Sequence, residues 1–215
     1  MNLPEEIDEH SPEDVFWTAV LFESGLGLLA VILGWALGPD PRDLIPRLEW
    51  AQLWPIASGL MYGCLAAIPI LVFIEIIQRL PWEPVRQLER LGDDTLLKTL
   101  RQLRPSELVL ISLCAGIGEE LLFRGWMLCY FIGDTTLGDP SMLELSIAVV
   151  GSSIAFGLMH PITKLYIFLA AIIGVYLSVL MLMTGNLLIP IVAHALYDAV
   201  QLIWGDHREQ PQTAS

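Results

Sequence analysis

Two adjacent glutamates and an arginine lie deep inside a long apolar run of the sequence. Glu119, Glu120 and Arg124 occupy the middle of a run that extends from about residue 108 to residue 132. A charged side chain at the centre of a bilayer costs roughly 2.5–3.5 kcal/mol on insertion scales, so such groups are expected to be compensated or used. Residues four positions apart share a helix face, so we expect Glu120 and Arg124 to neutralise each other. Glu119 points about 100° away from Glu120 and has no partner within its own helix, which makes it a candidate functional carboxylate.

Two histidines occupy other apolar runs, and each has a companion four residues away. His160 ends the motif Phe156-x-x-x-His160, and His194 begins the motif His194-x-x-x-Asp198. The second spacing places His194 and Asp198 on one face of a helix, from which both side chains can reach a common cavity. The remaining histidines of the chain lie in its polar tails.

A glutamate and two histidines can perform two kinds of chemistry. They can bind zinc through one carboxylate and two imidazoles, with Glu119, His160 and His194 as ligands. They can also hydrolyse a bond without metal, with Glu119 as the general base that activates water and the histidines positioning the water and stabilising the oxyanion. The sequence contains neither the His-Glu-x-x-His pattern of zinc peptidases nor a Gly-x-Ser-x-Gly nucleophile pattern. We therefore expect activated water and no cofactor, with zinc as the alternative.

The three motifs follow one another in separate apolar runs: Glu119-Glu120-x-x-x-Arg124, Phe156-x-x-x-His160 and His194-x-x-x-Asp198. This order resembles the pattern of the CPBP family of intramembrane endopeptidases. That family includes the CaaX prenyl endopeptidases of the Ras-converting type and bacterial bacteriocin-processing and self-immunity proteins. The resemblance covers about residues 106–204. It implies that Glu119 activates the water, that His160 and His194 assist, and that Asp198 contributes to the oxyanion site.

The last motif position leaves two roles open. The family accepts Asn or Asp there, but an ionised Asp198 cannot stabilise an oxyanion. Asp198 is therefore either protonated, or it orients His194. Glu120, Arg124 and Phe156 are assigned to structural support of the site.

Composition places these motifs in a membrane protein. Of the 215 residues, 54% are hydrophobic and 16% are charged, which is far too apolar for a soluble domain. Apolar runs long enough to cross a bilayer cover about residues 15–37, 53–77, 108–132, 143–160, 163–183 and 187–204. The basic, leucine-rich stretch 79–105 predicts an amphipathic helix on the membrane surface. The predicted fold is thus an all-α polytopic membrane helix bundle, with about six spanning helices plus this interfacial helix. Glu23, in the first run, could be part of a site, but is expected near the interface or hydrogen-bonded inside the bundle.

The predicted organisation has four parts: an acidic tail (1–14), two spans with the amphipathic linker (15–105), the catalytic membrane core (106–204) and a polar tail (205–215). The first tail has no Lys or Arg, which excludes a cleaved signal peptide. The net charge of −13, without a basic patch, excludes nucleic acid as a partner. Most Lys and Arg residues lie in 79–105, so the positive-inside rule predicts that both termini are cytoplasmic in the cell inner or plasma membrane.

We interpret the chain as a membrane-embedded peptidase of the glutamic type. A zinc peptidase that uses the same residues is one alternative. A non-catalytic membrane protein, such as an immunity factor, a chaperone or a transporter, is another. A transporter would be expected to show internal repeats or paired broken helices, and the sequence shows neither. The expected partners are the lipid bilayer and a peptide or protein substrate, for which a prenylated C-terminal peptide, a peptide pheromone or a membrane-protein tail would each fit.

Overall fold

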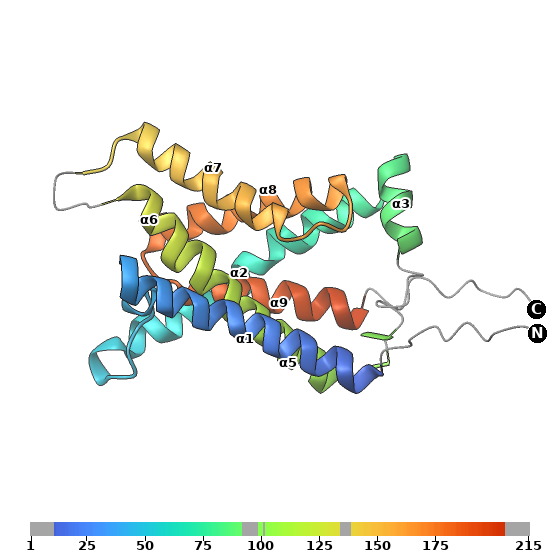
Figure 1. Cartoon of the computed structure of the whole chain (residues 1–215), viewed down its shortest axis with the longest axis horizontal. Coiled ribbons are helices and arrows are strands. Elements are labelled where there is room, and N and C mark those ends of the chain that lie inside the picture. The colour runs from blue at the N-terminus through green and yellow to red at the C-terminus, as the bar shows by residue number, and fades with distance from the viewer. Residues whose placement is uncertain (1–10, 92–98, 101, 134–138, 205–215) are drawn as a thin grey trace, which may run out of the picture.

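The regular structure is helical throughout the part of the chain that the computed structural model describes, residues 11–91, 99–100, 102–133 and 139–204 (Figure 1). The elements in chain order are α1 (Pro12–Leu37), η1 (Pro41–Leu44), η2 (Trp50–Gln52), α2 (Leu53–Gln78), α3 (Glu83–Leu91), α5 (Pro105–Glu120), η3 (Leu121–Met127), α6 (Leu128–Ile132), α7 (Met142–Leu158), α8 (Lys164–Thr184) and α9 (Leu188–Trp204). The predicted all-α bundle is confirmed.

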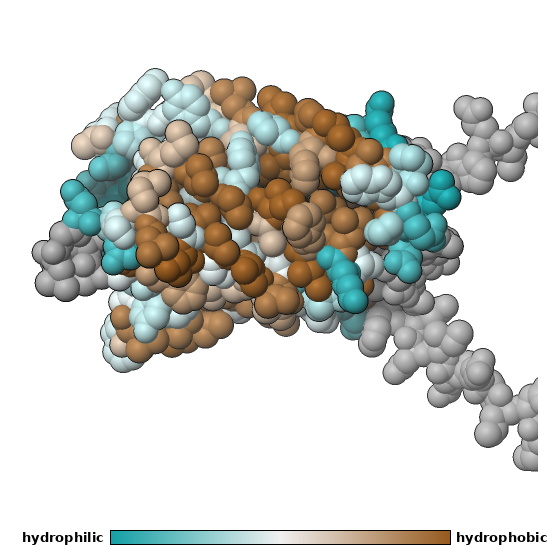
Figure 2. Space-filling view, turned by 90° about the horizontal axis from the view of Figure 1, so that it is seen from above, coloured by the Kyte–Doolittle hydropathy of each residue, from teal (hydrophilic) through white to brown (hydrophobic). Residues whose placement is uncertain are grey.

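On the face shown in Figure 2, apolar side chains cover most of the middle of the bundle, and polar side chains gather toward its two ends. Helices α1, α2 and α8 are long and apolar enough to cross a membrane, while α7 and α9 are apolar helices of 17 residues each. Elements α5, η3 and α6 follow one another without a break from Pro105 to Ile132. Three of the predicted spans therefore meet the length required, and spanning by the other three remains a prediction.

Two features of the predicted organisation can be placed on the structure. The hydroxyl of Ser11 accepts a hydrogen bond from the Asp14 backbone N–H, so α1 begins at Pro12, inside the segment assigned to the acidic tail. The predicted interfacial helix is represented by α3, and residues 92–98 and 101 of that stretch lie outside the described residues. The rest of the acidic tail and the polar tail 205–215 also lie outside them.

The start of α1, the end of α9 and helix α3 lie at the same end of the bundle (Figure 1). Phe16, Leu108 and Ile203 pack together there. Both ends of the described chain therefore share one side with α3, as the predicted orientation requires.

Glycines let the helices that carry the motifs approach closely. Helix α5 packs between α1 and α9, α2 packs against α9, and α7 packs against α8. A Cβ atom on Gly116 would lie 2.9 Å from the backbone nitrogen of Ala195, so only glycine allows α5 to pack this closely against α9. Small residues allow such close packing at helix contacts in membrane proteins. Close packing matters there because the hydrophobic effect does not drive helices together in lipid. The contact fixes the first motif against the third.

The turn between α8 and α9 sets the start of the third motif helix. Gly185 adopts φ 61° and ψ 13°, a left-handed conformation that favours glycine and ends α8. The Asn186 side chain then accepts a hydrogen bond from the Leu188 backbone N–H at 3.0 Å, and α9 begins.

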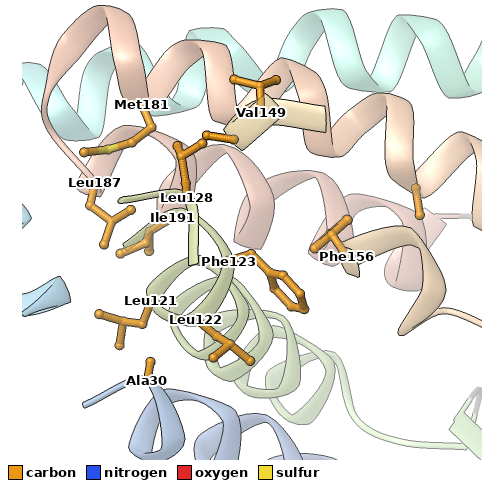
Figure 3. Packing of buried hydrophobic residues seen from close by; sticks show 12 residues of the cluster. Ala30, Leu121, Leu122, Phe123, Leu128, Val149, Phe156, Met181, Leu187 and Ile191 are labelled. Carbon is orange, nitrogen blue, oxygen red and sulfur yellow. The ribbon is translucent and has the colours of Figure 1, made fainter. Parts of the chain in front are cut away.

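The largest buried apolar cluster surrounds η3 (Figure 3). Leu121, Leu122 and Phe123 of η3 share this cluster with Ala30 of α1, and Phe123 makes an edge-to-face contact with Phe156 of α7. The first motif thus lies where α1, α5, α7 and α9 meet.

Candidate active site

The two glutamates end α5, and the chain continues directly into the π-helical segment η3. A π segment holds an extra residue per turn and is frequent at functional sites. Sequence reasoning predicts an ordinary α-helix here, because no residue type marks a π segment. Arg124 nevertheless remains within reach of Glu120 across the start of this segment.

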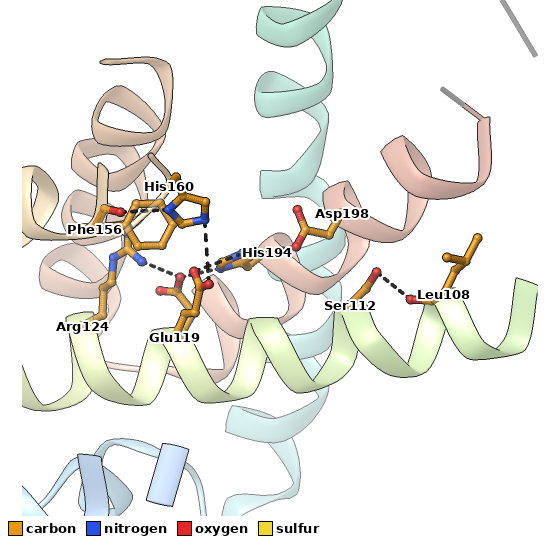
Figure 4. Close-up of polar contacts among 9 residues, drawn as sticks. Leu108, Ser112, Glu119, Arg124, Phe156, His160, His194 and Asp198 are labelled. Atoms are coloured by element: carbon orange, nitrogen blue, oxygen red, sulfur yellow. Dashed lines mark hydrogen bonds and ion pairs between the residues drawn. The ribbon is translucent and has the colours of Figure 1, made fainter. Parts of the chain in front are cut away.

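Glu120 is completely buried, and one of its oxygens makes close contacts with two residues that Figure 4 labels, Arg124 and His194. Arg124 Nη1 donates to Glu120 Oε1 at 2.6 Å, and His194 Nδ1 lies 2.7 Å from the same atom. The ion pair predicted from the spacing is present. The contact with His194 joins α5 to α9, and local spacing could not predict it.

Arg124 is also completely buried, and its guanidinium carbon lies 4.2 Å from the centre of the Phe156 ring. A cation above an aromatic face is attracted to it, most strongly where water is excluded. Phe156 thus supports the arginine, while Glu120 neutralises it.

Glu119 is only 6% exposed and lies between the two motif histidines. Its Oε1 is 3.8 Å from His160 Nε2, and its Oε2 is 3.9 Å from His194 Nε2. These separations exceed a direct hydrogen bond and suit a bridging water. Glu119 Oε2 has no hydrogen-bond partner within the described part of the chain.

His160 follows α7 directly, and Pro161 comes next. Its Nδ1 is 2.9 Å from the Phe156 carbonyl oxygen, an acceptor, so Nδ1 carries the proton and donates it. In the neutral ring, Nε2 then presents a lone pair toward Glu119. The second motif therefore fixes both the position and the tautomer of its histidine.

His194 is 2% exposed, and both of its ring nitrogens face carboxylates. Nδ1 contacts Glu120, and Nε2 is 3.4 Å from Asp198 Oδ2. A neutral imidazole has one N–H, whereas a protonated imidazole can donate to both partners. Asp198 thus faces His194 from the same helix, as its spacing predicts.

A cavity of about 390 Å³ leads from the site to the α3 end of the bundle. Phe156, His160 and Asp198 line it at the site, and Val85 and Leu88 of α3 line it at the other end. Most of the remaining lining is apolar and comes from α2, α8 and α9.

Glu23 is a candidate that sequence reasoning ranked below the motif residues. The structure favours the alternative that Glu23 belongs to the site: its backbone carbonyl contacts α5 at Gly118, inside the bundle, and its Oε2 is buried without a hydrogen-bond partner among the described residues. Its carboxylate interacts electrostatically with Glu119 and His194. Gly118, directly before Glu119, is the sequence signal that marks this close helix contact.

The predicted zinc ligands supply suitable donor types. Within the residues that the structure describes, however, no group of three or more His, Cys, Asp or Glu side chains is arranged to hold a metal ion. Zinc binding by Glu119, His160 and His194 stays a prediction that chelation can test.

Comparison with known proteins agrees with the motif pattern. The family model described as type II CAAX prenyl endopeptidase Rce1-like matches residues 102–200. No curated protein and no solved structure matches the chain. The matched segment contains all three motifs and follows the apolar helices α1 and α2. Residues 102–200 of this membrane protein are therefore similar to the Rce1-like CAAX prenyl endopeptidases, a family of proteases.

Proposed function

We propose that the chain is an intramembrane endopeptidase that hydrolyses a peptide bond with water activated by Glu119. The observation that carries this proposal is the position of Glu119 between His160 and His194, with gaps of 3.8 and 3.9 Å that suit a water molecule. Without such a water, the unbonded oxygen of the buried Glu119 carboxylate would lower the stability of the folded protein.

In the proposed first step, the water donates one proton to Glu119 and its other hydrogen bond to His160 Nε2. Its oxygen then attacks the carbonyl carbon of the substrate. Glu119 subsequently returns the proton to the leaving nitrogen, so the C–N bond breaks and an acid and an amine are formed. The Phe156 carbonyl supports this role, because its oxygen lies 2.9 Å from His160 Nδ1 and accepts the hydrogen bond that Nδ1 donates.

His194 is the proposed donor to the oxyanion. Glu120 anchors its Nδ1 at 2.7 Å, and Arg124 neutralises Glu120. Nε2, the nitrogen nearest both Glu119 and Asp198, is left to direct its proton toward the developing negative charge. Asp198 in this proposal orients His194 and stabilises its charged form, the second of the two roles left open by the sequence.

The proposed substrate is a membrane-anchored or prenylated peptide or protein that enters from the α3 end. The apolar cavity of about 390 Å³ that joins this end to His160 supports that route. Because α3, which belongs to the basic stretch 79–105, lies at the same end, we assign this end to the cytoplasm and both termini with it, in the cell inner or plasma membrane.

The test uses the purified chain in lipid nanodiscs and a fluorescence-quenched peptide that ends in a farnesylated Cys-a-a-X sequence. A matched peptide without the farnesyl group tests the lipid requirement. We expect cleavage that survives dialysis against a chelator, without stoichiometric metal by mass spectrometry. Loss of cleavage on chelation and its return with zinc would instead support the zinc peptidase.

The three central residues provide a second arm of this test. Glu119→Gln, His160→Ala and His194→Ala should each lower kcat severely, and a variant carrying all three changes should be little worse than Glu119→Gln alone, because residues that act as a unit are not additive. Retention of the biological activity in Glu119→Gln would favour the non-catalytic alternative.

A further inference from the structure

We infer that Tyr166 is a further catalytic residue, whose hydroxyl donates a hydrogen bond to the carbonyl oxygen of the scissile peptide bond. This inference rests on the proposed function and adds a second oxyanion donor beside His194. Tyr166 lies in the first turn of α8, outside the three motifs.

The turn between α7 and α8 places Tyr166 beside His160. The Ile162 backbone N–H donates to the His160 carbonyl oxygen at 2.8 Å. The Thr163 hydroxyl accepts a hydrogen bond from the Tyr166 backbone N–H at 3.0 Å and caps α8. The centre of the Tyr166 ring is then 5.9 Å from the centre of the His160 ring. Backbone geometry thus brings Tyr166 to the histidine of the second motif.

Tyr166 lines the cavity of about 390 Å³ together with His160 and Asp198. Two charged side chains of the site act on it electrostatically, Asp198 more strongly than Glu119. His194 Nε2, the proposed oxyanion donor, lies 3.4 Å from Asp198 Oδ2. Asp198 is therefore a shared neighbour of His194 and Tyr166, which come from α9 and α8. A carbonyl oxygen bound at this part of the cavity wall can meet both donors.

The Tyr166 hydroxyl makes no hydrogen bond within the part of the chain that the structure describes. The other tyrosine of α8 differs in this respect, because the Tyr176 hydroxyl donates to the Ala66 carbonyl oxygen at 3.0 Å. A tyrosine hydroxyl inside a protein usually has such a partner. Since Tyr166 lines the cavity instead, its hydroxyl is available to a bound substrate.

Tyr197 also lines the cavity, but its ring has another task. It stacks on His194, with ring centres 5.1 Å apart and planes inclined by 10°. It is also part of a buried cluster with Ile70 and Leu177, which joins α2, α8 and α9. Tyr197 therefore supports His194 and the helix packing, and Tyr166 is the tyrosine assigned to the substrate.

The hydroxyl acts when the water oxygen attacks. An electron pair of the carbonyl double bond then moves onto the carbonyl oxygen, which becomes negatively charged. His194 and Tyr166 each donate a hydrogen bond to this oxygen, and Tyr166 keeps its proton. The electron pair returns to the carbon when the C–N bond breaks. A donor placed in this way stabilises the transition state more than the bound substrate.

Tyr166→Phe tests this role, because it keeps the ring beside His160 and removes only the hydroxyl. Cleavage of the farnesylated peptide in nanodiscs should show kcat lowered about 10²–10³-fold, the usual effect of losing one oxyanion donor. KM should change less than about threefold, because an interaction made only in the transition state lowers kcat and kcat/KM equally. Thermal melting should match wild type. Tyr176→Phe is the matched control: it loses a structural hydrogen bond from the same helix and should keep its kcat.

A transition-state analogue separates the catalytic role from a structural one. A peptide with a phosphinate in place of the scissile amide carries a negative oxygen where the oxyanion forms. Tyr166→Phe should weaken inhibition by this analogue about 10²–10³-fold, in line with its loss of kcat/KM. The Kd of the uncleaved peptide, measured in Glu119→Gln with and without Tyr166→Phe, should stay the same.

Three results would overturn the inference while leaving the proposed function in place. Tyr166→Phe could keep both its kcat and its affinity for the phosphinate. Tyr197→Phe could show the expected losses in its place, which would assign the donor to Tyr197. Tyr166→Phe could also melt at a lower temperature and bind the peptide and the phosphinate with equal losses, which would indicate a structural role. Failure of the wild-type protein to cleave the peptide above the Glu119→Gln background would contradict the proposed function itself, and the inference with it.

Discussion

Replacement of Arg124 by methionine tests whether the buried ion pair holds the site together. Both Arg124 and Glu120 are completely buried, and their Nη1 and Oε1 atoms are 2.6 Å apart. Arg124→Met keeps a long side chain in the same space but removes the charge. Glu120 would then be left as a buried anion with His194 as its remaining partner.

The expected loss can be built from three terms. Removal of one partner from a buried pair typically costs about 3–5 kcal/mol. The contact of Arg124 with the Phe156 ring, at 4.2 Å, contributes about 2 kcal/mol more where water is excluded. His194 lies 2.7 Å from the same Glu120 oxygen and still stabilises the carboxylate charge, so it offsets part of this loss of stability. We therefore expect a loss of about 3–5 kcal/mol in the free energy of unfolding.

The assay is thermal melting of the purified variant in detergent, with the amount of folded protein in the membrane as a second readout. A loss of this size should lower the melting temperature by about 6–20 °C in a chain of this length. The matched comparison is Glu120→Gln combined with Arg124→Met. Replacing both charges should be less harmful than the sum of the single changes, with a coupling of about 1–3 kcal/mol. An Arg124→Met variant that accumulates and melts like wild type but cleaves nothing would refute the structural role and place Arg124 in the chemistry.

Three further predictions follow from the geometry. Gly118→Ala should lower stability by about 1–3 kcal/mol in a melting experiment, because its Cβ collides with the α1 backbone, whereas Gly25→Ala, with nothing within 4 Å, should be tolerated; equal melting temperatures would contradict the contact. Asp198→Asn and Asp198→Ala should both reduce kcat about 10–100-fold, since in the proposed mechanism the negative charge of Asp198 stabilises the protonated His194; a mild loss in Asp198→Asn alone would show that a neutral side chain is sufficient. In a cysteine-free background, Trp82→Cys near α3 should be labelled from the cytoplasmic side, and Leu48→Cys, in the loop between α1 and α2, from the opposite side; the reverse result would overturn the orientation.

The spacing of residues within one helix predicted the local features of the site. The pairing of Glu120 with Arg124 and the approach of Asp198 to His194 both occur at four-residue separations, where helix geometry alone brings side chains together. The all-α membrane fold followed from the apolar runs. These predictions depend on local geometry and composition, which a sequence displays directly.

Contacts between helices could not be predicted in this way. The hydrogen bond from His194 to Glu120 depends on α9 lying against α5, which the close packing of Gly116 on Ala195 permits. The orientation of Glu23 depends in the same way on the contact of α1 with Gly118. A sequence shows that glycines flank the glutamate pair, but it does not show which helix occupies the space that they leave.

The most direct test of the central claim compares Glu119→Gln with Glu120→Gln, two isosteric changes at adjacent positions. Glu119 lies 3.8 and 3.9 Å from the two histidines, whereas Glu120 joins Arg124 to His194 at 2.6 and 2.7 Å. Single-turnover cleavage and thermal melting should be measured on both variants in the same nanodiscs. The account predicts that Glu119→Gln melts like wild type and loses cleavage by at least about 10²–10⁴-fold, while Glu120→Gln is destabilised and keeps cleavage in proportion to the folded fraction. Cleavage that survives in folded Glu119→Gln and disappears in folded Glu120→Gln would contradict it, because the water-activating base would then be the other glutamate.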